Sequence, residues 1–222
     1  MDFTAIINGL LISMPVLILS LSVHETAHAV SALYFGDTTA RDLGRITLNP
    51  VAHVDIIGTL IVPIVAVLSF GFAMIGWAKP VPVNLLNLGN YRRDYSLVAL
   101  AGPVSNILLS FVFLLAAVIL LATGVAHGEE GVGTFLYKLV DYGIRINVAL
   151  AVFNMLPIPP LDGSHILEYF LPLKVAESYS RIGAYGFFIL IFLINIPIFN
   201  SLLSLIISTV MQPYNFVLLH FF

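Results

Sequence analysis

Long apolar runs separated by short polar stretches dominate the chain. The first run extends from about Ile6 to Tyr34 and ends at Gly36. At about 1.5 Å of rise per residue, a helix of this length crosses a bilayer and emerges from it. Comparable runs from Tyr95 to Thr123 and from Leu136 to Met155 predict two further spanning helices.

The apolar stretch from Ile56 to Trp77 is interrupted by residues that break helices, namely Gly58, Pro63, Gly71 and Gly76. Such breakers at membrane depth need protein or water around the backbone, so the stretch either spans once or enters the membrane and returns. Re-entry keeps five cations on one face of the membrane, as the positive-inside bias favours: Arg41, Arg45, Lys79, Arg92 and Arg93. We therefore expect re-entry, with these cations on the cytosolic side.

The remaining segments are shorter or more ambiguous. Residues 40–48 predict a short strand or hairpin outside the membrane core, followed by a turn at Asn49-Pro50. A short segment from Asp162 to Phe170 follows a proline-rich break, and residues 182–222 supply one span and then either a second span or a half-inserted helix. The predicted fold is all-α, a polytopic helical membrane protein with about four to six membrane segments and a short β-like stretch on the cytosolic side.

Composition agrees with this pattern, because 59% of the 222 residues are hydrophobic and only 9% are charged. We expect residues 1–222 to form a single membrane-embedded domain in a multi-pass protein of the cell membrane. The net charge of −3 and the lack of a basic run give no support to nucleic-acid binding. Cysteine is absent, which excludes disulfides, thiolate metal ligands and a cysteine nucleophile.

Two imidazoles and a carboxylate lie within the first apolar run, in the sequence His24-Glu25-Thr26-Ala27-His28. In a helix, His24 and His28 at i and i+4 project from one face and can hold one metal ion between them. Zinc suits such ligands, and it lowers the pKa of a bound water to about 7. Glu25, beside the metal, is then the candidate general base for attack on a carbonyl.

Short motifs of this kind also arise by chance in charged soluble helices. Here chance is a poor explanation, because an ionisable residue inside a bilayer costs on the order of 3 kcal/mol by insertion scales. Three such residues in one apolar helix need a partner or a function.

A third zinc ligand is expected from Asn154-Met155-Leu156-Pro157-Ile158-Pro159-Pro160-Leu161-Asp162-Gly163, where the acid Asp162 follows a broken helix. His24 lies about 18 residues along its helix from Ile6, and Asn154 about 18 from Leu136, so both reach a similar depth. Asp162 alternatively caps the helix that it begins. The other possible ligands are His165, His53 and Glu168.

Three further polar residues are candidates for roles around the metal. Asn154 either makes an interhelical hydrogen bond or holds the substrate backbone or a developing oxyanion. His53 belongs to a loop and is more plausible as a residue lining the site than as a ligand. For Asn106 we favour the interhelical hydrogen bond.

These residues together resemble the site-2 protease family of intramembrane zinc metalloproteases, in particular its compact members without PDZ or CBS domains. The segments that carry the resemblance are HETAH at 24–28, NPVAH at 49–53, GWAKPVPVN at 76–84, AGPVSN at 101–106 and NMLPIPPLDG at 154–163. By similarity, His24, His28 and Asp162 are the zinc ligands, Glu25 is the general base and Asn154 lies near the substrate. Ser164-His165 replaces the Gly-Arg pair that is frequent in the family, which leaves substrate selection open.

The resemblance implies hydrolysis of a peptide bond in or near a transmembrane helix of a membrane-protein substrate, for regulated proteolysis or for clearance of peptide remnants. It also places the active site toward the cytosol. The alternative is a membrane divalent-metal transporter, or a metal-binding membrane protein without proteolysis. A transporter is expected to repeat ligands along a pathway and often to show internal symmetry, whereas this chain has one cluster and one distant acid.

Overall fold

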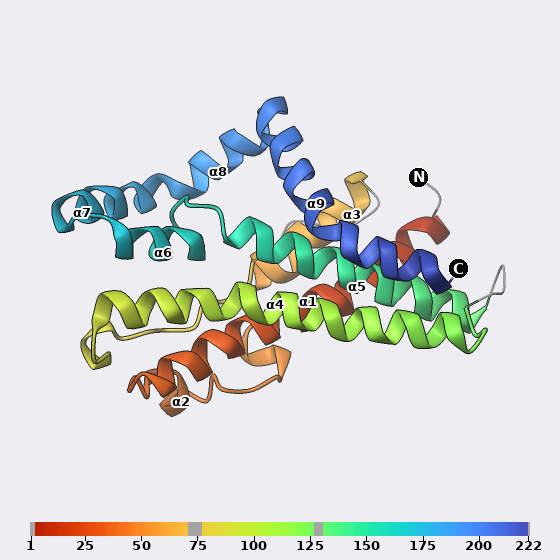
Figure 1. The fold of residues 1–222 in the computed structure, drawn as a ribbon, viewed down its shortest axis with the longest axis horizontal. Helices are drawn as coiled ribbons and strands as arrows, with labels where there is room; N and C mark the ends of the chain where they lie inside the picture. Colours follow the sequence, from red (N-terminus) through yellow and green to blue (C-terminus); the bar gives the residue numbers. More distant parts are fainter. Residues whose placement is uncertain (1–2, 71–76, 127–130, 222) are drawn as a thin grey trace.

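The computed structural model describes residues 3–70, 77–126 and 131–221. Four long helices form a bundle, and the shorter helices pack around it (Figure 1). The long helices are α1 (Phe3–Tyr34), α4 (Tyr91–Ala122), α5 (Val132–Asn154) and α9 (Pro197–Phe221). The predicted helix boundaries differ from the observed ones by only a few residues. The described residues contain no β-strand, so the all-α prediction is confirmed.

The core lies where α1, α4, α5 and α9 pack together. Leu17 of α1, Phe113 of α4 and Ile144 of α5 are buried in one apolar cluster. The α4 and α5 backbones approach closely because Gly143 has no side chain, and a Cβ there would overlap the ring of Phe113. On the α9 side, the Tyr214 hydroxyl lies 2.7 Å from Ser110 Oγ of α4, a buried polar contact within an apolar interface.

Along the sequence, the segment that connects α1 to α4 forms several short helices. They are α2 (Thr39–Asp42), a 3₁₀ turn (Pro50–Ala52), a π-helical turn (Ile56–Ile61), α3 (Val62–Phe70) and a second 3₁₀ turn (Leu85–Asn87). The predicted strand at 40–48 is not confirmed. The Asp37 carboxylate accepts from Thr39 N and starts a helical turn instead, and Gly44, at φ 66°, ends it.

The apolar stretch after residue 56 returns to its starting point. Trp77 N donates to Gly58 O at 3.1 Å, and Thr59 Oγ1 donates to Trp77 O at 2.8 Å. These contacts join the two ends of the stretch, as re-entry requires; residues 71–76, including the predicted breakers Gly71 and Gly76, lie outside the described part.

Three described helices are long and apolar enough to cross a membrane: Ile6–Tyr34 within α1, Tyr91–Ala122 and Pro197–Phe221. A fourth crossing is counted if the bent pair Leu173–Tyr185 and Phe188–Ile194 forms one span. The upper part of the predicted range of four to six is therefore not confirmed. One reason is α5, which was predicted to span but carries Lys138, Asp141 and Arg145. The multi-pass character of the protein follows from the three long apolar helices.

An arm of shorter helices connects α5 to α9 (Figure 1). It consists of α6 (Asp162–Phe170), α7 (Leu173–Arg181), a 3₁₀ turn (Ile182–Tyr185) and α8 (Gly186–Ile194). Helix α6 begins and ends at the predicted residues and packs along α4. This packing brings the first residue of α6 to the histidines of α1.

Candidate metal centre

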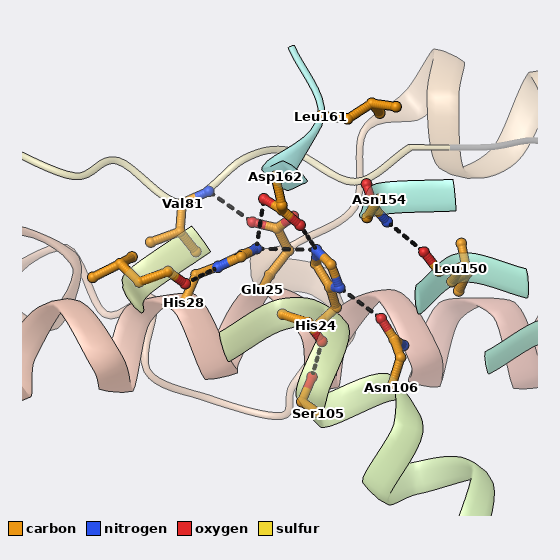
Figure 2. Close-up of polar contacts among 12 residues, drawn as sticks. His24, Glu25, His28, Val81, Ser105, Asn106, Leu150, Asn154, Leu161 and Asp162 are labelled. Atoms are coloured by element: carbon orange, nitrogen blue, oxygen red, sulfur yellow. Dashed lines mark hydrogen bonds and ion pairs between the residues drawn. The ribbon is translucent and has the colours of Figure 1, made fainter. Parts of the chain in front are cut away.

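Three predicted ligands converge at the contact of α1 with α6 (Figure 2). His24 and His28 project from one face of α1, with their Nε2 atoms 3.0 Å apart. Asp162 lies opposite, with Oδ2 at 3.2 Å from His24 Nε2 and Oδ1 at 3.4 Å from His28 Nε2. The Asp162 carboxylate thus faces the histidines, and its Oδ2 makes no hydrogen bond within the described residues.

The other ring nitrogens fix the orientation of both imidazoles. His28 Nδ1 lies 2.7 Å from Val98 O, and His24 Nδ1 lies 2.6 Å from Asn106 Oδ1. A carbonyl oxygen only accepts, so Nδ1 carries the proton in each ring. In the neutral rings, both Nε2 atoms therefore present lone pairs toward Asp162.

The Asn106 amide is itself oriented by a buried chain of hydrogen bonds across three helices. Its Nδ2 donates to Asn147 Oδ1 at 2.8 Å, and Asn147 Nδ2 donates to Gly143 O and to Ser20 Oγ, each at 2.8 Å. Asn106 and Asn147 are both fully buried. Since every donor in this chain has an acceptor, Asn106 Oδ1 is left to accept from His24.

The arrangement fits a metal cation. Two nitrogen lone pairs and two carboxylate oxygens face one another, and Asp162 Oδ2 is buried without a hydrogen bond. Acceptors packed together in this way repel unless a cation lies among them. One ligand atom from each residue falls within 4.8 Å of the others, and two imidazoles with one carboxylate form a usual ligand set for catalytic zinc.

Gly102 of α4 supports the two imidazoles from behind. A Cβ at this position would overlap His28 Nε2 and His24 Cε1. The absence of a side chain at Gly102 therefore makes room for the pair of histidine rings.

Glu25 lies beside the three converging residues without joining them (Figure 2). Its Oε2 accepts a hydrogen bond from Val81 N at 2.8 Å. Val81 belongs to the irregular stretch 77–84, which Arg45 holds in place by donating to Lys79 O at 2.6 Å and Pro80 O at 3.3 Å. One carboxylate oxygen of Glu25 is therefore anchored next to the histidines.

Asp37 anchors the other end of the stretch 77–84. Its carboxylate accepts from Asn84 N at 2.7 Å and from Asn87 Nδ2 at 2.8 Å. Burial by itself raises the pKa of Asp37, but the hydrogen bonds from Thr39, Asn87 and Asn84 outweigh it and hold that pKa below its usual range. The carboxylate thus stays charged and ties this stretch to the end of α1.

A cavity of about 220 Å³ opens over the converging residues. Its walls come from α1, the stretch 77–84, α4, the break after α5 and α6. The lining residues are His24, Glu25, His28, Pro80, Val81, Val83, Tyr95, Val98, Ala99, Asn154, Pro160, Asp162 and His165. A peptide segment entering this space meets the predicted ligands and Glu25 together.

The remaining predicted residues are placed differently. Asn154 lines the cavity, although its Nδ2 donates to Leu150 O at 3.0 Å within its own helix. His165 also lines the cavity, but it contacts Tyr95 and Glu168 and does not belong to the three converging residues. His53 is buried, lies outside the cavity lining and approaches Thr47 O at 2.8 Å with Nε2. The roles predicted for Asn154 and His53 beside the substrate stay predictions.

Sequence reasoning missed the support that surrounds the ligands. Asn106 was assigned an interhelical hydrogen bond, which it makes, but its contact with His24 was not foreseen. Asn147 and the Val98 carbonyl were not considered at all. The available signal was spacing, since Val98, Gly102 and Asn106 follow one another at i+4 along α4 and so share one face.

Comparison with known proteins shows which protein family this chain resembles. The model of peptidase family M50 matches residues 124–194. The Bacillus subtilis protein named "Putative zinc metalloprotease YwhC" is 40% identical over 185 residues, which cover 82% of this chain and 79% of that protein. "Putative zinc metalloprotease Rip2" of Mycolicibacterium smegmatis is 30% identical over 183 residues, covering 82% of this chain and 66% of that protein. No solved structure matches.

Helices long enough to span a membrane, a group of three residues that could hold a metal ion and these relatives together define a membrane-embedded zinc metalloprotease. The chain belongs to peptidase family M50, the site-2 protease family. The resemblance stated from the motifs is thereby confirmed.

Proposed function

We propose that His24, His28 and Asp162 bind one zinc ion per chain and that Glu25 is the general base in peptide hydrolysis. The observation that carries the proposal is the orientation of the histidines. Both Nδ1 atoms are bound to acceptors, so both Nε2 lone pairs point at the Asp162 carboxylate, whose Oδ2 is buried without a hydrogen bond. Bound zinc would supply Lewis acidity toward the scissile carbonyl and acidify a water in the site.

Residues of the protein position the substrate and accept the proton of the attacking water. Val81 N–H holds one oxygen of Glu25, which leaves the other to accept a proton from the attacking water. Asn154, at the wall of the cavity, has an amide oxygen and a second amide hydrogen available for the substrate backbone. His53 lies 3.5 Å from Thr26 Oγ1 of α1, and its role beside the substrate remains a prediction.

The substrate that we propose is a transmembrane segment of another protein, cleaved in or near its helix. The cavity lies among helices that are apolar enough to span a bilayer, and a peptide that reaches it must come from the membrane or its boundary. The clustering of Arg41, Arg45, Lys79 and Arg92 on the segments around the cavity favours an active site toward the cytosol. We further propose that residues 1–222 act as one membrane-embedded domain.

Replacing Glu25 by Gln tests this assignment. The variant should keep its zinc, because Glu25 lies outside the ligand group, and should lose at least about 100-fold in hydrolysis of a model transmembrane substrate, because no group then accepts the water's proton. Zinc content by elemental analysis and product by mass spectrometry are the two measurements. A zinc chelator should abolish wild-type cleavage, and Asp162→Ala should lose the metal.

Wild-type turnover in Glu25→Gln, or full zinc occupancy in Asp162→Ala, would contradict the assigned roles. The transporter alternative receives no support from the metal-ligating residues. The described part of the chain contains a single group of three such residues, whereas a transport pathway needs a succession of them.

A further inference from the structure

A second cavity, of about 360 Å³, adjoins the cavity over the metal centre. It lies between the N-terminal turns of α4 and the helices α6 and α7, which sit next to each other at one end of the molecule (Figure 1). Tyr95 and His165 line both cavities, so the two spaces meet at these side chains. We call the second space the Glu168 cavity. A peptide held over the metal centre has this space immediately beside it.

Two carboxylates and one guanidinium line the Glu168 cavity, those of Glu168, Glu177 and Arg92. The guanidinium is already engaged by backbone. Arg92 Nη2 donates to three carbonyl oxygens near the end of α6, at 2.6 Å to Glu168, 3.2 Å to Tyr169 and 2.5 Å to Leu171. Within the described residues, Arg92 forms no ion pair with either glutamate. The two carboxylates therefore leave the cavity with an excess of negative charge.

The Glu168 carboxylate is incompletely satisfied. Its Oε1 is buried and has no hydrogen-bond partner among the described residues, and its Oε2 lies 3.4 Å from His165 Nδ1. A buried carboxylate oxygen without a donor is costly, and a charged donor offers the strongest compensation. A cationic side chain in the adjoining cavity, which Glu168 lines, would supply such a donor to this carboxylate.

The rest of the lining suits a long side chain with a charged end. Tyr91, Tyr95, Tyr169 and Leu173 form aromatic and aliphatic walls. Lysine and arginine place their methylene stems along such surfaces and present the charge at the tip, and tyrosine rings also attract cations. A free metal ion would gain nothing from these walls.

We propose that the Glu168 cavity binds a lysine or arginine side chain of the substrate, close to the cleaved bond, and so selects where the protease cuts. This inference rests on the proposed function. It also agrees with the substrate class, because the cytosolic ends of transmembrane segments are enriched in Lys and Arg. Such a residue would sit next to the cut in the substrates that this active site meets.

A lysine scan of the substrate tests the proposal. One Lys, or Met as a neutral residue of similar length, is placed at each position around the cut in a model transmembrane substrate, and the full-length protease in liposomes is assayed for kcat/KM. We expect one position at which Lys is preferred over Met by about 10-fold, the size expected of one hydrogen bond to a charged group. The preference should fall to about 2-fold or less when Glu168→Gln and Glu177→Gln are combined.

Two further variants make the result decisive. Glu177 is exposed, so Glu177→Lys should fold normally and should shift the preference at that position from Lys toward Glu. Asp141→Asn removes a carboxylate that pairs with Arg145 on α5 and should leave the Lys preference unchanged. Zinc content measured in every variant shows whether the metal centre has survived.

Equal cleavage of the Lys and Met substrates at every position, or a Lys preference that persists in both glutamate variants, would overturn the proposal. Failure of the proposed function looks different. In that case wild type and Glu25→Gln would give the same result with every substrate, whatever residue lies beside the cut.

Discussion

At the scale of single residues, the proposed metal centre depends on side chains other than its three proposed ligands. His24 owes its orientation to Asn106, Asn106 to Asn147, and Asn147 to Ser20 and a carbonyl of its own helix. Hydrogen bonds of this kind fix the tautomer and the ring angle of a metal-binding histidine. Because each amide in the chain has only one arrangement that satisfies its neighbours, loss of one member should disturb the next.

Asn106→Ala should therefore weaken zinc binding by about 10- to 100-fold, the usual cost of removing an outer partner of a ligand. Competition with a chelator of known affinity measures the change. Asn195→Ala is the matched control, because the Asn195 side chain is exposed and donates to Ile191 O of the preceding helix α8. Unchanged zinc affinity in Asn106→Ala would show that packing alone holds the His24 ring.

At the scale of secondary-structure elements, the sequence was sufficient where a pattern is local. The apolar length of α1 and the spacing of His24 and His28 are properties of one helix, and both were predicted. The start of α6 at Asp162 was predicted from the proline-rich break before it. Contacts between residues far apart in the sequence were harder to predict. Val81 N–H reaches Glu25 across 56 residues of sequence, and no periodicity indicates such a contact.

The predicted strand at 40–48 illustrates the same limit. A strand needs a neighbouring strand to receive its backbone hydrogen bonds, and none is present in the described part of the chain. Local side chains meet this need instead. Asp37, Asn49, Asp55 and Asn84 each accept hydrogen bonds from backbone N–H groups and begin or close short turns.

The predicted re-entry of the element that begins at Ile56 leads to a labelling experiment. Leu43→Cys and Leu86→Cys place thiols before and after the re-entrant stretch at positions that are 64% and 93% exposed, in a chain with no native cysteine. Both thiols should react with an impermeant maleimide from the same side of the membrane. Val125→Cys, beyond the far end of α4, should react from the opposite side and serves as the control. Reaction of residues 43 and 86 from opposite sides would mean that the stretch spans.

At the scale of the whole molecule, the proposed function requires hydrolysis of a peptide bond in a cavity that lies among membrane helices. Polar groups from α1, α4, α6 and the stretch 77–84 meet in one cavity, while α1, α4 and α9 are apolar enough to cross a membrane. Such a cavity admits a peptide only if the peptide's own backbone is accessible. A helical substrate conceals its carbonyls in i to i−4 hydrogen bonds, so it must unwind locally before the cut.

Unwinding exposes backbone groups that lipid cannot satisfy, and the protein must replace their partners. The stretch 77–84 is suited to this task, because it is irregular and contributes Pro80, Val81 and Val83 to the cavity wall. An extended substrate lying along it would exchange hydrogen bonds lost within the helix for bonds to protein backbone. The energetic cost that remains is set by how readily the substrate leaves the helical state.

Residues that weaken a helix should therefore speed cleavage. Gly is about 1 kcal/mol and Pro about 3 kcal/mol less favourable than Ala inside a helix, so either residue near the cut lowers the cost of unwinding. We expect a model transmembrane substrate with Gly or Pro beside the cut to be cleaved about 5-fold faster or more than one with Leu throughout that region. Initial rates in liposomes at matched substrate binding measure the effect, and a substrate with Gly placed far from the cut controls for changes in insertion. Because the proposed gain comes only from the unwound segment, equal rates across the near-cut series would show that another step limits the reaction.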